Sequence, residues 1–157
     1  MSFRRGDCRA QLRELMSKIT ADEFKQRLEA LCLSAGGRGL PRKRRDWDIL
    51  FKSITLALEP GRDYSEKEVN QVVKEWLADI GQGIEIDHVT LRRHLVDAGH
   101  LVRDLAGTSY RIGSEAAADL FEPATDTVDP VAVIEEARRR KEQRKRQYLG
   151  SKDRSST

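Results

Sequence analysis

The chain of 157 residues is long enough for one domain with a hydrophobic core plus extensions, and too short for two ordinary domains. Charged residues make up 35% of it and aromatic residues 6%, which favours a mainly helical protein over a β-sandwich. No apolar run approaches the roughly 20 residues of a membrane span, and no apolar signal segment follows the basic start. We therefore expect a cytoplasmic protein with no membrane partner.

The net charge of +3 conceals a strong segregation of charge along the chain. Residues 38–45 carry five basic side chains and no acidic one, whereas residues 46–113 carry eight basic and twelve acidic side chains. Local patches decide what a surface attracts. The expected central domain is therefore itself acidic and follows a basic linker.

Residues 1–37 are predicted to form a helical extension. Thr20 and Glu23 fit a capping box, and Gly36-Gly37 provides a natural helix end. The apolar residues at helical spacing are Leu12, Leu15, Met16 and Ile19 in a first helix, then Phe24, Leu28, Leu31 and Cys32 in a second. Cys8 and Cys32 lack a paired spacing, so we expect reduced thiols rather than a disulfide or a zinc site.

Three further helices are predicted within residues 46–113. The first runs over 46–58 until Pro60-Gly61, and the second starts at a Ser65/Glu68 capping box and ends at Gly81. The third has Asp87 as N-cap, extends to Ala98 and is followed by Gly99 in a left-handed conformation. The core side chains expected from the helical spacing are Trp47, Leu50, Phe51, Ile54, Trp76, Leu91, Leu95 and Ala98.

Alternating residues around a Gly107 turn predict a β-hairpin over 101–112, with Tyr110 packed inward. Three helices followed by a hairpin predict a mainly α fold, a winged helix-turn-helix with extra N- and C-terminal helices. Residues 114–128 are expected to be a linker with at most a short helix near 115–121. Asp129 and Pro130 then start a basic C-terminal helix over 129–150, and residues 151–157 are expected to be disordered.

The third helix is the element with which such a fold would read bases in the major groove. Its exposed sector holds Thr90, Arg93 and Asp97, flanked by His94, whereas Arg92 falls between two apolar stripes and is expected to pair with a carboxylate. Phosphate contacts are expected from the basic linker and from the hairpin. Their side chains are Arg42, Lys43, Arg44, Arg45, Arg103 and Arg111.

Catalysis and cofactor binding are not indicated. His88, His94 and His100 are spaced so that they do not share a helix face, and no catalytic triad order, phosphate-binding loop or dinucleotide-binding motif is present. We therefore expect no enzyme activity, no metal and no cofactor.

Long motifs in the central region resemble a known family. They are Leu-Pro-Arg-Lys-Arg from Leu40, Tyr-Ser-Glu-Lys-Glu-Val-Asn from Tyr64, and Leu-Arg-Arg-His-Leu-Val-Asp from Leu91. The region from Leu40 to Tyr110 resembles the bacterial domain of unknown function 2087. The resemblance implies a winged-helix module, of a kind attached in some members to helix-turn-helix transcriptional regulators.

Two functions remain open at this point. One is a DNA-binding transcriptional regulator that reads DNA with the third helix and holds phosphates with the basic segment. The other is a protein-protein interaction module without nucleic-acid binding, which would dock partners on its acidic surface and form a homo-oligomer through its terminal helices. The DNA-binding regulator is the leading hypothesis, although Asp97 and the acidic central domain argue against a simple groove-reading account, because carboxylates repel phosphates.

Overall fold

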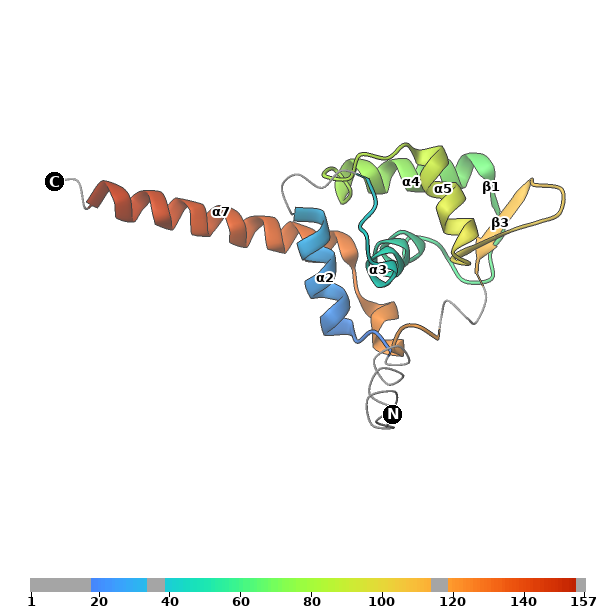
Figure 1. Ribbon diagram of the computed structural model, residues 1–157, viewed down its shortest axis with the longest axis horizontal. Helices are drawn as coiled ribbons and strands as arrows, with labels where there is room; N and C mark the ends of the chain where they lie inside the picture. The colour runs from blue at the N-terminus through green and yellow to red at the C-terminus, as the bar shows by residue number, and fades with distance from the viewer. Residues whose placement is uncertain (1–17, 34–38, 114–118, 155–157) are drawn as a thin grey trace, which may run out of the picture.

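The computed structural model describes residues 18–33, 39–113 and 119–154, and shows a small helical core from which one long helix projects (Figure 1). The helices are α2 (Ala21–Leu33), α3 (Arg44–Thr55), α4 (Glu66–Asp79), α5 (His88–Asp97) and α7 (Pro130–Arg154), with a 3-10 helix at Pro123–Thr127. The strands are β1 (Tyr64–Ser65), β2 (Leu101–Arg103) and β3 (Ser109–Ile112). The chain is therefore mainly helical, as the composition predicts.

The predicted helix ends around α4 and α5 are confirmed. Ser65 and Glu68 form a complete capping box, in which each side chain accepts a hydrogen bond from the backbone N–H of the other. Asp87 caps α5 by accepting from the N–H of Thr90. Gly99 follows α5 at a φ of 82°, a conformation that side chains with a Cβ rarely adopt.

The hairpin is also confirmed, and a short strand that the sequence pattern missed completes it. Strands β2 and β3 pair antiparallel, and β1 adds to the free side of β3, so the sheet order is β1-β3-β2. Tyr110 sits at the centre of the sheet opposite Tyr64, and only 2% of it is exposed. The inward packing predicted for Tyr110 is therefore correct, and β1 was missed because a strand of two residues has no visible alternation.

The N-terminal part of the core differs from the prediction. Ile19 was expected in a first helix, but it forms a parallel bridge with Phe121, and the remainder of that helix lies outside the described residues. The N–H of Glu23 donates to Thr20, yet the Glu23 carboxylate binds Arg45 instead of completing a capping box. Segment 119–128, expected to be linker, thus carries a buried aromatic residue and a 3-10 helix that pack near α2.

One hydrophobic cluster joins α2, the three central helices, the hairpin and the start of α7. Leu91, Leu95 and Phe51 are fully buried and Trp76 is 5% exposed, as predicted, whereas Trp47 and Ala98 are only partly buried. Helix α3 begins at Arg44, two residues earlier than expected, and ends at Thr55. Arg44 and Arg45 therefore belong to a helix rather than to the basic linker.

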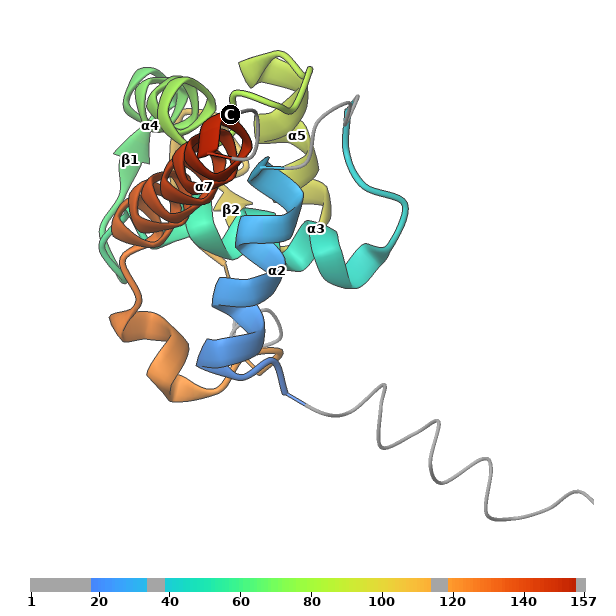
Figure 2. The same cartoon turned by 90° about the vertical axis from the view of Figure 1, so that its left-hand side faces the viewer.

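Helix α7 begins as predicted, with Pro130 in its first turn and the Asp129 carboxylate accepting from two backbone N–H groups. Ile134 and Ala137 are buried, and from residue 139 to 152 every side chain is exposed, so the helix leaves the core on the side away from the hairpin (Figures 1 and 2). It continues to Arg154, which corrects the expected disorder of residues 151–154. None of the helices in the described ranges is long and apolar enough to cross a membrane.

The position of Cys32 gives a first testable prediction. It lies in α2, and burial raises the pKa of its thiol to about 12. Because the thiolate is the reactive form, we expect Cys32 in a Cys8→Ser variant to resist dithionitrobenzoate in native buffer at neutral pH and to react on denaturation. Rapid labelling of the native variant would contradict the packing of α2.

Candidate nucleic-acid interface

Three residues of α5 were expected to face DNA, and they differ in their exposure and in their contacts. Arg93 is exposed and forms no ion pair with any described residue. The hydroxyl of Thr90 donates to the Asp87 carboxylate at 2.7 Å, and this bond is the main reason that the pKa of Asp87 is lowered. His94 is partly buried, with its ring edge-on to Trp47 at 5.3 Å between centroids. Arg93 is thus the side chain of the three that is freest to reach a ligand.

The basic run lies at the start of α3. Arg42, Lys43 and Arg44 are exposed, and Lys43 is the N-cap residue but makes no side-chain capping bond. Three cations therefore surround the end of a helix where the backbone dipole is already positive. This concentration of positive charge is unfavourable in the isolated protein and favours a bound anion.

Trp47 connects the basic run to α5. Its indole N–H donates to the carbonyl oxygen of Pro41, the Arg44 guanidinium lies over its ring at 5.3 Å, and the His94 ring packs edge-on against the indole. Two segments that are about fifty positions apart in the sequence are thereby held together. Sequence spacing placed Trp47 in the core, and the structure places it at the edge of the core as the support for this surface.

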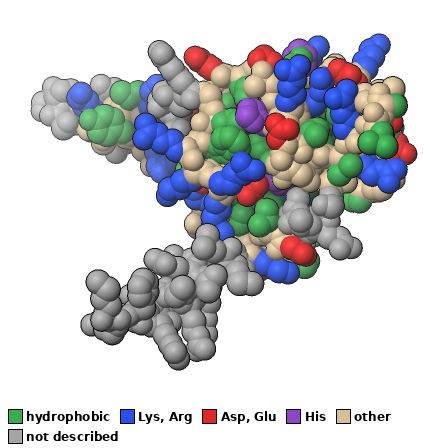
Figure 3. Space-filling model, turned by 45° about the vertical axis from the view of Figure 1, so that its right-hand side comes forward, with side chains coloured by type: hydrophobic (Ala, Val, Ile, Leu, Met, Phe, Trp, Pro, Cys, Tyr) green, Lys and Arg blue, Asp and Glu red, His purple; other side chains and the backbone are tan. Residues whose placement is uncertain are grey.

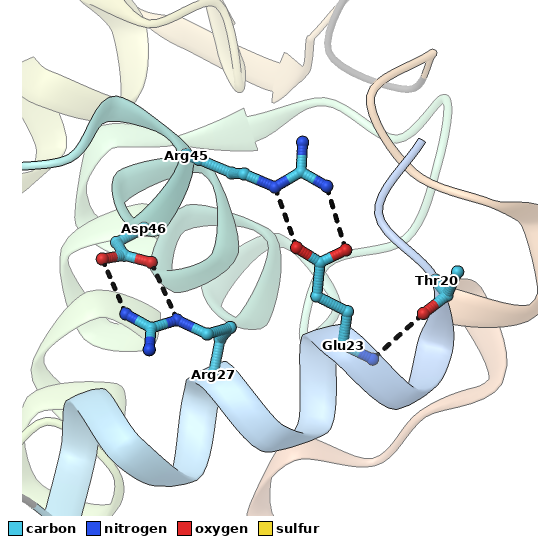
Figure 4. A network of polar contacts seen from close by, with 5 residues as sticks. All are labelled: Thr20, Glu23, Arg27, Arg45 and Asp46. Atoms are coloured by element: carbon cyan, nitrogen blue, oxygen red, sulfur yellow. Dashed lines mark hydrogen bonds and ion pairs between the residues drawn. The ribbon is translucent and has the colours of Figure 1, made fainter. Parts of the chain in front are cut away.

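Arg45 faces the other way and is held by α2 (Figure 4). Its Nε and Nη2 donate to the two carboxylate oxygens of Glu23, each at 2.9 Å, and these bonds raise the pKa of Arg45. Beside it, Arg27 of α2 binds the buried Asp46 in the same two-pronged way, at 3.1 and 2.9 Å. In one pair the arginine belongs to α2 and the carboxylate to α3, and in the other pair the reverse holds. The two pairs therefore fix the start of α3 on α2.

The arginines of the hairpin are both exposed, as predicted, but they differ in their partners. Arg111 donates twice to Asp63, with its shorter contact at 2.6 Å. Arg103 lies over the ring of Tyr110 at 5.9 Å and forms no ion pair within the described ranges. Arg103 is therefore the freer cation of the two.

Arg92 has the structural role that its position between the apolar stripes predicts. Its Nη1 lies 3.0 Å from the carboxylate of Glu66, and it also donates to the side chain of Asn70. Only 9% of the residue is exposed. It ties α5 to the start of α4 and is not available to an external ligand.

The histidines do not assemble into a site. His100 is buried, with its Nε2 at 2.9 Å from the Asp48 carboxylate and its ring against Phe51. Among the residues that the structure describes, no three His, Cys, Asp or Glu side chains are placed to share a metal ion. The buried His100–Asp48 pair was not anticipated, because the two residues lie 52 positions apart.

The resulting surface is mixed rather than uniformly basic. Figure 3 shows, on one face of the molecule, Lys and Arg side chains near histidine side chains, with acidic side chains between them. On α5 itself Asp97 is exposed, one turn beyond Arg93. The positive part of the surface is thus the combination of Arg42, Lys43, Arg44 and Arg93, named here the arginine face.

Comparison with known proteins supports the family resemblance of this region. Residues 38–112 match the family described as "Uncharacterized protein conserved in bacteria (DUF2087)". The match begins at the basic run and ends with strand β3, so it covers the arginine face and the sheet. No curated protein and no solved structure matches the chain.

Proposed function

We propose that residues 44–112 form a winged-helix module that binds DNA and acts in transcriptional regulation, with α5 in the major groove. The element order α3, β1, α4, α5, β2, β3 supports this proposal, since α4 and α5 follow each other as the two helices of a helix-turn-helix do. The hairpin β2–β3 would then be the wing. An α-helix fits the width of the major groove, and α5 presents exposed polar side chains to it.

The observation that carries the proposal is the Trp47 contact between the basic run and α5. Arg44 and His94 pack on the same indole, so the cations of Arg42, Lys43 and Arg44 lie beside the helix that would read bases. Phosphate contacts fix a protein on the duplex while base contacts select sequence. A basic segment next to a reading helix supplies both kinds of contact on one surface.

Ion pairing narrows the set of DNA contacts that we propose. Arg45 and Arg111 are bound by Glu23 and Asp63, and an arginine already held by a carboxylate has less to gain from a phosphate. The phosphate contacts are therefore assigned to Arg42, Lys43, Arg44 and Arg103, and the base contact to Arg93. Thr90 and His94 shape this surface through their contacts with Asp87 and Trp47.

The role of Arg93 can be tested by selecting bound sequences from a random DNA pool. Arg93→Ala is expected to bind random DNA nearly as well as the parent protein but to lose about 1–3 kcal/mol of preference for the selected sequence. Competition binding with the selected and scrambled duplexes measures this difference. The matched control is Arg139→Ala on α7, which should keep the preference, and an unchanged preference in Arg93→Ala would remove α5 from base reading.

A second candidate function, docking of a protein partner or of a second copy, is favoured by one observation. The distal part of α7 is exposed over its whole surface, and Tyr148 and Leu149 are 66% and 52% exposed near its end. A helix that is polar on all sides is stabilised either by side-chain pairs along it, such as Arg146–Glu142, or by a partner that covers it. Light scattering of the parent protein and of a Tyr148→Ser, Leu149→Ser variant distinguishes docking of a second copy from docking of another protein. Only self-association predicts that the molar mass of the particle in solution falls in the variant.

A further inference from the structure

A groove along α4 has the dimensions of a small-molecule site. It has a volume of about 330 Å³ and is bounded by the end of α3, one face of α4 and the residues that lead into α7. Binding sites for small molecules range from about 300 to 1,000 Å³ and are mostly apolar with a few polar groups. The groove lies outside the arginine face and involves none of its residues.

The floor of the groove is apolar and its polar atoms are already satisfied. Trp76 is one of the lining residues although only 5% of it is exposed, and its indole N–H donates to the Ser53 hydroxyl at 2.8 Å, which in turn donates to the carbonyl oxygen of Leu50 at 2.6 Å. The floor therefore offers ring and hydrocarbon surface rather than free donors. The other apolar side chains of the lining are Leu56, Ala57, Val72, Ile80, Val128, Pro130 and Val131. Such a floor favours an aromatic or branched hydrocarbon body.

The rim of the groove is acidic. It holds the carboxylates of Glu75, Asp79 and Asp129, and no Lys, Arg or His is among the lining residues. Glu75 accepts from Gln71 and Asp129 caps α7, while the Asp79 carboxylate has no partner within the described ranges. Arg138 lines the adjoining groove and donates to the backbone oxygen of Asp79. The rim thus attracts a cation and repels an anion.

We infer that this groove binds a small organic cation, an ammonium or guanidinium group carried on an aromatic or branched apolar body. The hydrocarbon part packs on the apolar floor, and the cationic group lies among the rim carboxylates. A bound molecule would contact α3, α4 and the entry to α7 at once. This inference does not depend on whether the arginine face binds DNA.

Tryptamine, tryptophol and indoleacetate test the inference, because they share one ring system and carry a cation, a neutral hydroxyl and an anion. The full chain labelled with ¹⁵N is titrated with each, and the indole N–H signal of Trp76 is followed after assignment with Trp47→Phe. Ligands of this size reach dissociation constants of about millimolar. We expect tryptamine to bind at least about tenfold more tightly than tryptophol, and indoleacetate to bind more weakly than either.

Two variants and one control separate the contribution of the rim charge to binding from that of the groove's shape. Glu75→Gln with Asp79→Asn should reduce the affinity for tryptamine to that for tryptophol, whereas Glu85→Gln with Glu122→Gln removes the same charge from exposed positions outside the lining and should leave it unchanged. Ala57→Phe should fill the groove and abolish binding of all three. Equal binding of tryptamine and indoleacetate, binding that survives Ala57→Phe, or no shift of Trp76 at millimolar tryptamine would each overturn the inference.

Discussion

Replacing Arg42, Lys43 and Arg44 together by glutamine is expected to weaken binding to every DNA sequence and to flatten its salt dependence. Each lost phosphate contact removes about 0.9 from the slope of log K against log salt, so the slope should fall by about 2.7. The three side chains are exposed, and their loss relieves the positive charge at the start of α3. This relief offsets the loss of the Arg44 contact with the Trp47 ring, so the variant should keep its fold, and circular dichroism of the variant checks that weaker binding is not due to unfolding.

The matched control removes three cations from α7 instead. Arg139, Arg144 and Lys145 are exposed on the part of α7 that leaves the core on the side away from the hairpin (Figure 1). Their replacement by glutamine changes the net charge equally but should leave the slope nearly unchanged. Fluorescence anisotropy with a labelled duplex over a salt series measures both variants, and equal slopes would show that the arginine face has no special role.

Truncating Phe24 to alanine is expected to destabilise the whole protein by about 3–5 kcal/mol, the usual loss for a buried phenylalanine. The ring of Phe24 is fully buried and meets the ring of Phe121 edge-on at 6.1 Å between centroids. The substitution would leave a cavity between α2 and segment 119–128. Urea unfolding followed by circular dichroism gives the change in free energy.

Lys25→Ala, at the adjacent exposed position of α2, is the control and should change the stability by less than about 0.5 kcal/mol. A single unfolding transition for parent and variant would show that α2 unfolds together with the central helices. A loss below about 1 kcal/mol for Phe24→Ala, or an early separate transition, would instead mean that α2 is a loosely attached extension.

The features that could be predicted from the sequence are those whose signals are local. The capping box of Ser65 and Glu68, the Asp87 cap and the Gly99 helix end each depend on residues within four positions of one another, so their pattern is visible in the chain. The hairpin around Gly107 is of the same kind. The bridge between Ile19 and Phe121 is not, because it joins segments that share no local pattern.

In the candidate site, too, features with a local signal could be predicted and contacts between distant residues could not. Spacing on a helix was enough to show that Arg93 is exposed and that Arg92 pairs with a carboxylate. It did not show that Arg45 and Arg111 are held by Glu23 and Asp63, which lie 22 and 48 positions away. Nor did it show the role of Trp47, whose apolar spacing indicates a core residue while its indole N–H and its cationic neighbour keep it at the surface.

The central proposal is tested most directly by the binding of the full-length parent protein to fragmented genomic DNA across a salt series. With four phosphate contacts, from Arg42, Lys43, Arg44 and Arg103, the proposal predicts a complex at low salt and a slope of about −3.6 in log K against log salt. Electrophoretic mobility shift resolves the complex and gives the slope. Absence of any complex at the lowest salt, or binding that does not respond to salt, would contradict DNA binding and leave the docking of a protein partner as the function to pursue.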